Sequence, residues 1–113
     1  MTTKLYIMNN NYNQTISNNS IRVLATLEAK EGKLKELLNI LLPIVEASRK
    51  EDGNISYILN SSLDRPNELL FDEVWSSKEA FDKHYNQKES KDNRNKITDL
   101  VLKPLEIKLF KEI

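Results

Sequence analysis

Cysteine is absent from the 113-residue chain, and its absence removes several kinds of chemistry at once. Disulfide bonds, catalytic thiolates and metal sites built on cysteine are all excluded. Glycine is nearly as scarce, since the chain has only Gly32 and Gly53. A glycine-rich loop that cradles a phosphate group needs more glycines than this. The sequence therefore argues against disulfide scaffolds, cysteine enzymes and P-loop nucleotide-binding proteins.

The chain also lacks an excess of charge of either sign. Lysine and arginine total 17, aspartate and glutamate total 17, and the formal net charge is zero. No long basic run is present, which argues against nucleic acid or an anionic membrane as the main partner. No stretch approaches 18 apolar residues, and the N-terminus lacks the apolar segment of a signal peptide. We therefore expect a soluble cytoplasmic protein that binds neither nucleic acid nor membrane.

The length fits one domain with a single modest core. Residues 1–20 differ from the rest, because asparagine, serine, threonine and glutamine dominate residues 9–20 and leave little to bury. A short strand fits residues 4–8. We predict an N-terminal asparagine-rich arm over residues 1–20 and one folded domain over residues 21–113. The arm is either a passive loop or a cover for a pocket or a partner subunit.

The folded part alternates between two hydrophobic periodicities. A period of two predicts strands over residues 21–29, 54–63, 69–75 and 105–109. Apolar residues at helical spacing predict one helix between Gly32 and Gly53 and further helical segments after Ser76 and Ser90. Pro43 lies within the first helix, where it removes a backbone hydrogen bond. We expect that helix to kink or to break into two pieces.

The element order is β-α-β-β-α-β, which is typical of an α+β, ferredoxin-like fold with a four-stranded antiparallel sheet. Helices in this fold cover one face of the sheet only. The other face also carries apolar side chains here, namely Leu24, Ile58, Leu70, Val74 and Phe110. An apolar sheet face needs a cover, and a second copy of the chain provides one. We therefore predict a homodimer, arranged as a dimeric α+β barrel.

The stretch over residues 69–85 is the most informative part of the chain, because a strand leads directly into a helix there. Trp75 lies at the junction, and Ser76 followed by Glu79 forms a capping-box pattern. In the helix that follows, Ala80, Phe81, His84 and Tyr85 share one narrow face. The only histidine of the chain therefore points inward, beside the apolar space that Trp75 borders.

Several motifs together resemble the antibiotic biosynthesis monooxygenase (ABM) family, over about residues 21–111. The matching segments are Glu31-Gly32-Lys33, the Glu51-Asp52-Gly53 turn before Tyr57, Glu73-Val74-Trp75, and residues 80–84 from Ala80 to His84. The order and spacing of these segments are more specific than any one of them. The resemblance implies a ferredoxin-like subunit, a dimeric α+β barrel and often a monooxygenase that uses neither metal nor flavin. It also implies quinols or polycyclic phenols as substrates, together with dioxygen.

This chemistry needs an apolar slot, a base and donors that face a developing oxyanion. His84 is the best base, because the unperturbed pKa of histidine lies near 6.5. We predict a catalytic set and a substrate-binding set. The catalytic set is His84, Asn60 and Trp75, and the substrate-binding set is Tyr57, Phe71, Glu73, Phe81, Tyr85 and Arg94. No metal site and no cofactor are expected.

Each of these residues also has a structural interpretation. An inward histidine or tryptophan often belongs to the core, Arg94 could pair with a carboxylate, and Glu73 could form a cross-strand ion pair. Two other functions stay open for the same scaffold. One is an isomerase or another proton-transfer enzyme that needs no oxygen, and the other is a ligand-binding stress module without catalysis.

Overall fold

The computed structural model describes residues 3–4, 16–17 and 19–113. Its elements are β1 (Thr3–Lys4), β2 (Ile16–Ser17), β3 (Ile21–Glu28), α1 (Leu34–Ser48), β4 (Asn54–Ser61), β5 (Glu68–Trp75), α2 (Lys78–Asn86), α3 (Lys88–Ile97), the 3-10 helix η1 (Thr98–Leu100) and β6 (Glu106–Phe110). From β3 onward this order confirms the expected β-α-β-β-α-β pattern, with the second helical region divided into α2 and α3.

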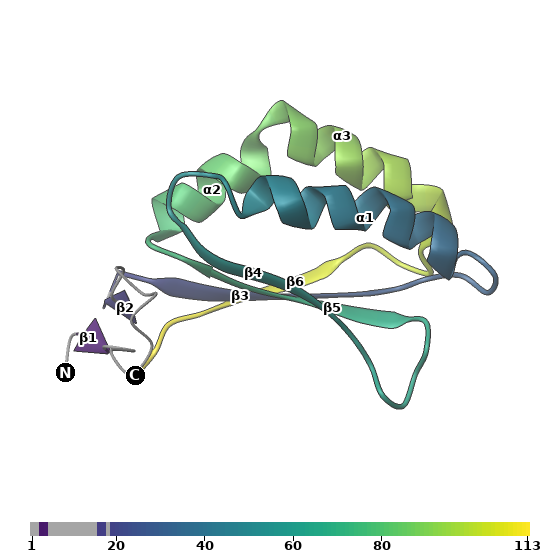
Figure 1. Ribbon diagram of the computed structural model, residues 1–113, viewed down its shortest axis with the longest axis horizontal. Helices are drawn as coiled ribbons and strands as arrows, with labels where there is room; N and C mark the ends of the chain where they lie inside the picture. The colour runs from purple at the N-terminus through teal and green to yellow at the C-terminus, as the bar shows by residue number, and fades with distance from the viewer. Residues whose placement is uncertain (1–2, 5–15, 18) are drawn as a thin grey trace.

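The main sheet has four antiparallel strands in the order β4-β5-β3-β6. Figure 1 shows α1, α2 and α3 packed together on one face of this sheet, and no helix of the described residues covers the other face. The ferredoxin-like α+β class is therefore confirmed. The structure describes one chain, so the predicted dimer stays a prediction.

The core lies between the sheet and α1. Every second residue of β3 and β5 faces the helices, because successive side chains of a strand point to opposite faces. Leu37, Leu41 and Val45 of α1 are buried at helical spacing against this surface. Their strand partners are Val23, Ala25, Leu27, Leu69 and Phe71. Burial of these apolar side chains is the main term that stabilises the layer packing.

The predicted break of the first helix at Pro43 is wrong. Helix α1 runs through Pro43 to Ser48 without interruption. Asn39, whose carbonyl loses its partner, lies on the exposed side of the helix with Pro43. Water can therefore bind the carbonyl that proline leaves free, and the buried side of the helix keeps its hydrogen bonds.

Two helix starts differ from the sequence prediction. The N-cap of α2 is Ser77 rather than Ser76, and the Ser77 hydroxyl accepts a hydrogen bond from the Ala80 amide at 3.1 Å. Helix α3 begins at Lys88, so Ser90 lies inside its first turn instead of capping it.

Little of the predicted N-terminal arm belongs to the described residues. Strands β1 and β2 pair antiparallel, with Thr3 opposite Ser17. Most of the predicted strand over residues 4–8 and most of the loop over residues 9–20 lie outside the described residues. The division between an arm and a domain therefore stays a prediction.

The face of the sheet away from the helices is partly apolar, as predicted. The strand register places Leu24, Ile58, Leu70, Val74 and Phe110 on it. Ile58 and Phe110 are 45% and 46% exposed, large fractions for such side chains. Between them, Arg22 and Asp72 form an ion pair with 3.3 Å between Nε and Oδ1. Among the described residues, no helix combines the length and apolar character needed to traverse a lipid bilayer.

Candidate functional site

The end of β5 and the start of α2 bring the predicted site residues together. Glu73 and Trp75 both point to the helical face, since they are two residues apart on one strand. The register places Tyr57 of β4 directly opposite Glu73. Helix α2 then presents Phe81 and His84, its two buried residues, to the same space.

A close contact at Gly53 brings a further group to this space. Gly53 has a φ of +84°, and a β-carbon placed on it would come within 2.6 Å of the Ala80 side chain. Only glycine therefore allows the loop after α1 to pass so close to α2. The Ser76 amide donates to the Gly53 carbonyl at 2.7 Å and fixes this approach. As a result, Glu51 lies beside His84.

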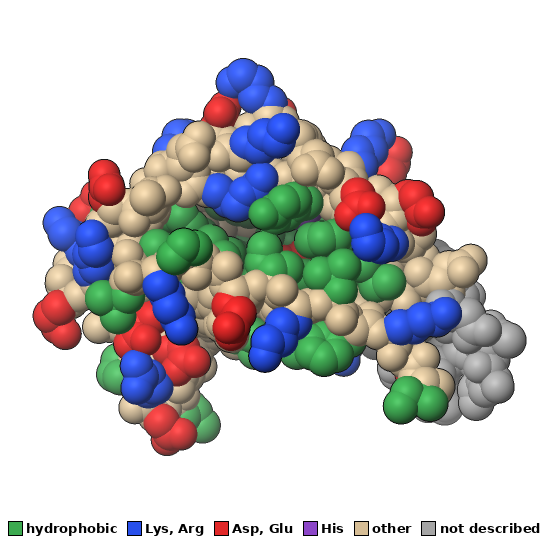
Figure 2. All heavy atoms as spheres, turned by 180° about the vertical axis from the view of Figure 1, so that it is seen from behind, with side chains coloured by type: hydrophobic (Ala, Val, Ile, Leu, Met, Phe, Trp, Pro, Cys, Tyr) green, Lys and Arg blue, Asp and Glu red, His purple; other side chains and the backbone are tan. Residues whose placement is uncertain are grey.

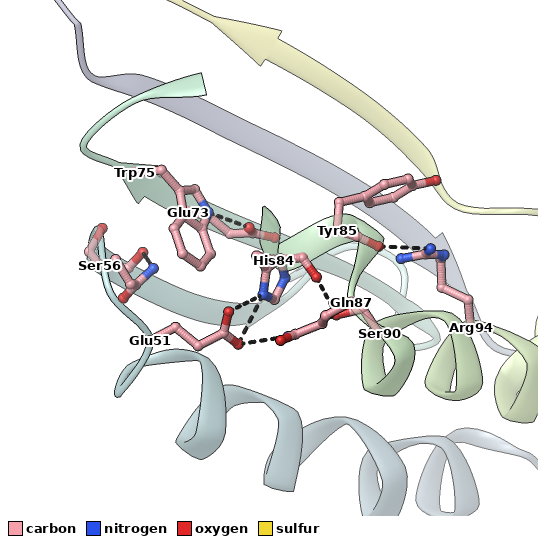
Figure 3. A network of polar contacts seen from close by, with 10 residues as sticks. Glu51, Ser56, Glu73, Trp75, His84, Tyr85, Gln87, Ser90 and Arg94 are labelled. Atoms are coloured by element: carbon pink, nitrogen blue, oxygen red, sulfur yellow. Dashed lines mark hydrogen bonds and ion pairs between the residues drawn. The ribbon is translucent and has the colours of Figure 1, made fainter. Parts of the chain in front are cut away.

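His84 is buried, and its ring is held by a carboxylate. Nδ1 lies 3.0 and 3.1 Å from the two carboxylate oxygens of Glu51 (Figure 3). Gln87 donates its side-chain amide to Glu51 at 3.1 Å and to the Ser90 hydroxyl at 3.2 Å. The Ser90 hydroxyl in turn donates to the His84 carbonyl at 2.6 Å. The imidazole thus has a fixed orientation in which Nδ1 is occupied and Nε2 has no partner among the described residues.

A second carboxylate, Glu73, is buried on the strand side of the same ring. The Trp75 indole donates to Glu73 Oε1 at 2.8 Å (Figure 3). Burial raises the pKa of Glu73 to about 7, and the negative charge of Glu51 adds to this, while the bond from Trp75 opposes it. Burial also raises the pKa of Tyr57, and the neighbouring Glu73 charge raises it further. Glu73 is therefore only partly ionised near neutral pH.

Aromatic rings surround the imidazole on several sides. The ring centroids of Trp75, Tyr57 and Phe81 lie 4.7, 5.7 and 6.3 Å from that of His84. Trp75 is fully buried, so these rings exclude water from one side of the base. Electrostatic interactions are stronger in such surroundings than in water.

A cavity of about 70 Å³ opens in front of this group. Figure 2 shows it as a hollow between the helical layer and the sheet, with hydrophobic side chains around it. Seven predicted residues line it, namely Tyr57, Phe71, Glu73, Phe81, His84, Tyr85 and Arg94. Leu105 and Ile107, at the edge of the sheet, and Arg94 of α3 complete the wall.

Tyr85 and Arg94 form a pair at this wall. The Arg94 guanidinium lies 3.8 Å from the centre of the Tyr85 ring and donates to the Tyr85 carbonyl at 2.9 Å. Among the described residues, Arg94 forms no ion pair with a carboxylate. The predicted structural alternative of a salt bridge for Arg94 is therefore not observed.

Asn60 is not part of this group. It lies on the opposite face of the sheet, exposed, and its amide donates to the Leu70 carbonyl at 3.2 Å. The reason is simple parity, because Asn60 and Tyr57 are three residues apart on one strand and point to opposite faces. The structure therefore corrects the assignment of Asn60 to the site. Trp75 does not line the cavity but supports His84 from behind.

Glu51, Gln87 and Ser90 are the site residues that the predicted sets lack. Hydrophobic periodicity could not find them, since none of them continues an apolar pattern. Glu51 did carry a signal, because it opens the Glu51-Asp52-Gly53 segment that precedes the Tyr57 strand. The described residues contain no group of three histidine, cysteine, aspartate or glutamate side chains that could hold a metal ion.

The comparisons with known proteins agree with this geometry. The sequence model of the family named antibiotic biosynthesis monooxygenase matches residues 20–96, which is more than half of the chain. The chain belongs to the ABM family. An uncharacterised protein from Synechocystis sp. is 34% identical over 91 residues, which are 80% of this chain and 62% of the relative. The chain thus spans less than two thirds of that relative's length.

Several solved structures show the same fold. A conserved protein from Methanosarcina mazei superimposes with a TM-score of 0.80 and 26% identity, covering 85% of this chain and 95% of the other. A Shewanella oneidensis protein gives 0.78 and 28%, covering 86% and 94%. A Deinococcus radiodurans protein, described as a candidate antibiotic biosynthesis monooxygenase, gives 0.78 and 24%, covering 82% and 92%.

Proposed function

We propose that this ABM-family protein is a cofactor-independent monooxygenase that acts on a quinol or a related electron-rich aromatic. The observation that carries the proposal is the position of His84. The single histidine of the chain is buried at an aromatic-lined cavity, and a carboxylate holds its Nδ1. In this arrangement Nε2 is the ring nitrogen left to take a proton from a ligand in the cavity, as expected for a general base.

The reaction begins with proton removal from a phenolic hydroxyl by His84 Nε2. The resulting anion is electron-rich and passes an electron to dioxygen, after which the two radicals combine. One oxygen atom ends as a carbonyl on the substrate, and the other leaves as water. Because the substrate supplies the electrons, the protein needs to supply a base, an apolar slot and groups that stabilise negative charge.

The other residues of the cavity have supporting roles in this proposal. Tyr57, Phe71 and Phe81 form aromatic walls for a flat ring, and Trp75 keeps His84 and Glu73 in place. Arg94 and Tyr85 bind a substrate oxygen at the wall formed by α3. The cavity of about 70 Å³ is smaller than the cavity of about 150 Å³ that admits benzene, so ring entry requires side chains such as Tyr85 to move.

Oxygen uptake with a panel of quinols tests the proposal. We expect wild-type protein to consume oxygen without added metal or flavin. His84→Ala should lose activity by roughly 10²- to 10⁴-fold, the usual contribution of a positioned general base. Lys83→Ala, an exposed neighbour on the same helix, is the matched control and should keep full activity. Circular dichroism of both variants checks that the fold is intact, and full activity in His84→Ala would refute the role of His84.

Proton transfer without oxygen is the second candidate function. The observation that favours it is the presence of two titratable groups, His84 and Glu73, on one small cavity. Such a pair can remove a proton from one atom and return it to another, as an isomerase does. Turnover of the same substrates under strictly anaerobic conditions would support the isomerase and contradict the monooxygenase.

We also propose that the protein acts as a homodimer. The partly apolar sheet face, with Ile58 and Phe110 exposed on it, supports this, because a solvated face of an antiparallel sheet is normally polar. A second copy related by a two-fold axis would cover the same residues on both chains.

A further inference from the structure

Two separate hollows meet at His84. One is the cavity between the helices and the sheet. The other is an open groove on the outer side of the helical layer, which runs between α1 and α3 and is lined by Asn39, Ala47, Glu51, Gln87, Glu89 and Lys96. His84 and Ser90 line both hollows. Ile44 and Asn93 line both as well, so the imidazole forms part of the wall between the cavity and the groove.

Glu51 connects the buried ring to that groove. The His84 side chain is 10% exposed, whereas the Glu51 side chain is 25% exposed. Glu51 lines the groove but not the cavity. Figure 3 shows its carboxylate between His84 and Gln87, below the ring and opposite Trp75. Nδ1 thus lies 3.0 Å from a carboxylate oxygen of a side chain that is open to water.

The cavity offers His84 no carboxylate that is as exposed as Glu51. Its lining is mostly apolar, and Glu73 and Tyr57, the other titratable groups that face His84 from the sheet, are buried. On the groove side, Glu89 and Lys96 of α3 are exposed and charged but form no hydrogen bond with His84. A positive imidazolium trapped among buried groups would be unfavourable, so its proton needs a path to water.

We propose that Glu51 is a proton-relay residue, which carries the proton that His84 takes from a cavity ligand to the groove on the other side of the helical layer. The inference rests on the proposed function, since it assumes that His84 acts as a base. Substrate and proton would then use opposite sides of the molecule. The substrate enters beside β6 and α3, and the proton leaves between α1 and α3.

The relay is a series of proton transfers with no change in electron count. The ligand O–H bond breaks as the Nε2–H bond forms, which gives an imidazolium. The Nδ1–H bond then breaks as an O–H bond forms on Glu51. Finally the Glu51 carboxyl group gives its proton to water in the groove, which leaves a neutral imidazole with the proton on Nε2. The cycle closes when the Nε2–H bond breaks as an O–H bond forms on water or on the reduced oxygen atom in the cavity, while Nδ1 takes a proton from groove water through Glu51.

A chromogenic phenol separates the relay from the oxygenation. 4-Nitrophenol changes colour on ionisation, and a pH indicator dye reports protons that reach the solvent. In a stopped-flow experiment with full-length protein, we expect phenolate and solvent protons to appear together in the wild type. In Glu51→Gln, which keeps an oxygen to accept from Nδ1 but cannot take a proton, the indicator signal should lag at least about tenfold behind the phenolate. Formate added at constant pH should shorten that lag.

Two further variants complete the design. Glu89→Gln removes the same charge from the same groove and should show no lag, and Glu51→Asp should restore most of the release rate. A residue that only orients His84 would change phenolate formation and leave the interval between the two signals unchanged. Equal proton release in Glu51→Gln and wild type would overturn the relay, as would the absence of phenolate in the wild type. A lag in Glu51→Gln without oxygen uptake in the wild type would retain the relay and reject the monooxygenase.

Discussion

Glu51 and Glu73 lie on two sides of one imidazole, and their surroundings give them different properties. Glu51 comes from a loop and is partly exposed, so its charge is solvated. Glu73 is 4% exposed and comes from the middle of the sheet. Desolvation penalises its charged form, and the hydrogen bonds from Trp75 and Tyr57 offset this only in part. A difference of this kind assigns different tasks to two chemically identical groups.

The pH dependence of stability should reflect Glu73. Its pKa is about 7 in the folded protein and 4.5 ordinarily, so the folded state keeps a proton over a range where the unfolded state has lost it. The free energy of unfolding should therefore fall by roughly 3 kcal/mol at most as pH rises from about 4.5 to 7. Above pH 7 it should level off. Denaturant unfolding across this range measures the effect.

Glu73→Gln should remove that decline, because the amide cannot ionise but can still accept from the Trp75 indole. Glu46→Gln, which alters an exposed carboxylate on α1, should retain it. An unchanged decline in Glu73→Gln would show that another group causes the pH dependence.

At the scale of residues, the sequence predicts which side chains lie close together better than it predicts what each of them does. An inward face on α2 and alternation on β4 and β5 were enough to gather Tyr57, Glu73 and His84. The bond between His84 and Glu51 joins residues 33 positions apart, and no local pattern encodes such a contact. The assignment of Asn60 to the site was wrong although the local pattern was informative. The alternation along β4 already placed Asn60 on the other face from Tyr57.

At the scale of elements, the two glycines have different tasks despite similar backbones. Both have positive φ, +77° at Gly32 and +84° at Gly53. A β-carbon at Gly32 would meet nothing within 4 Å, whereas one at Gly53 would collide with Ala80. Gly32 is therefore needed for its backbone conformation alone, and Gly53 for conformation and close packing against α2.

Alanine substitution at the two glycines should separate these effects. Gly32→Ala should lower the free energy of unfolding by about 1–2 kcal/mol, the usual penalty for a left-handed residue with a β-carbon. Gly53→Ala should cost about 1–3 kcal/mol more, because Ala80 must move. Chemical denaturation measures both losses. Equal losses in the two variants would show that Ala80 moves aside at no cost in stability.

The start of α2 gives a second test with a built-in control. Ser77→Ala removes the side chain that accepts from the Ala80 amide and should cost about 1 kcal/mol. Ser76→Ala, at the residue that the sequence pattern favours, should cost a few tenths at most. A larger loss of stability in Ser76→Ala than in Ser77→Ala would show that Ser76 is the N-cap, as the sequence predicted.

The start of α2 shows why helix boundaries predicted from the sequence can be wrong by a residue. Two adjacent serines offer equivalent caps, and the choice depends on where β5 ends, which is set by pairing with β3 and β4. The effect of Pro43 on α1 also depended on packing, because it was decided by which side of the helix faces solvent. The strands were predicted more reliably, because β3 and most of β5 alternate between buried and less buried residues.

At the scale of the whole molecule, the open question is what covers the sheet face opposite the helices. Helices on one side of the four strands cover only one of the two faces of the sheet, although both carry apolar side chains. The fold class followed from the order of elements, and the homodimer that we propose would cover this face.

Ultracentrifugation of a surface variant tests the proposed dimer. Ile58→Lys places a charge in the middle of the apolar face and should convert a dimer into a monomer, because an unpaired charge is costly to bury in an interface. Leu63→Lys adds the same charge in the loop between β4 and β5, where the side chain is fully exposed, and should leave the dimer unchanged. A wild-type protein that sediments as a monomer would contradict the proposal directly.

The close contact between the Trp75 and His84 rings makes the protein its own optical probe. The chain has one tryptophan and one histidine, and their ring centroids are 4.7 Å apart. Light absorbed selectively by the indole is therefore emitted from beside the imidazole and from nowhere else in the chain. Any ligand, proton or neighbouring ring that alters this small region will register in the intensity of the emission, without a label and without knowledge of the natural substrate.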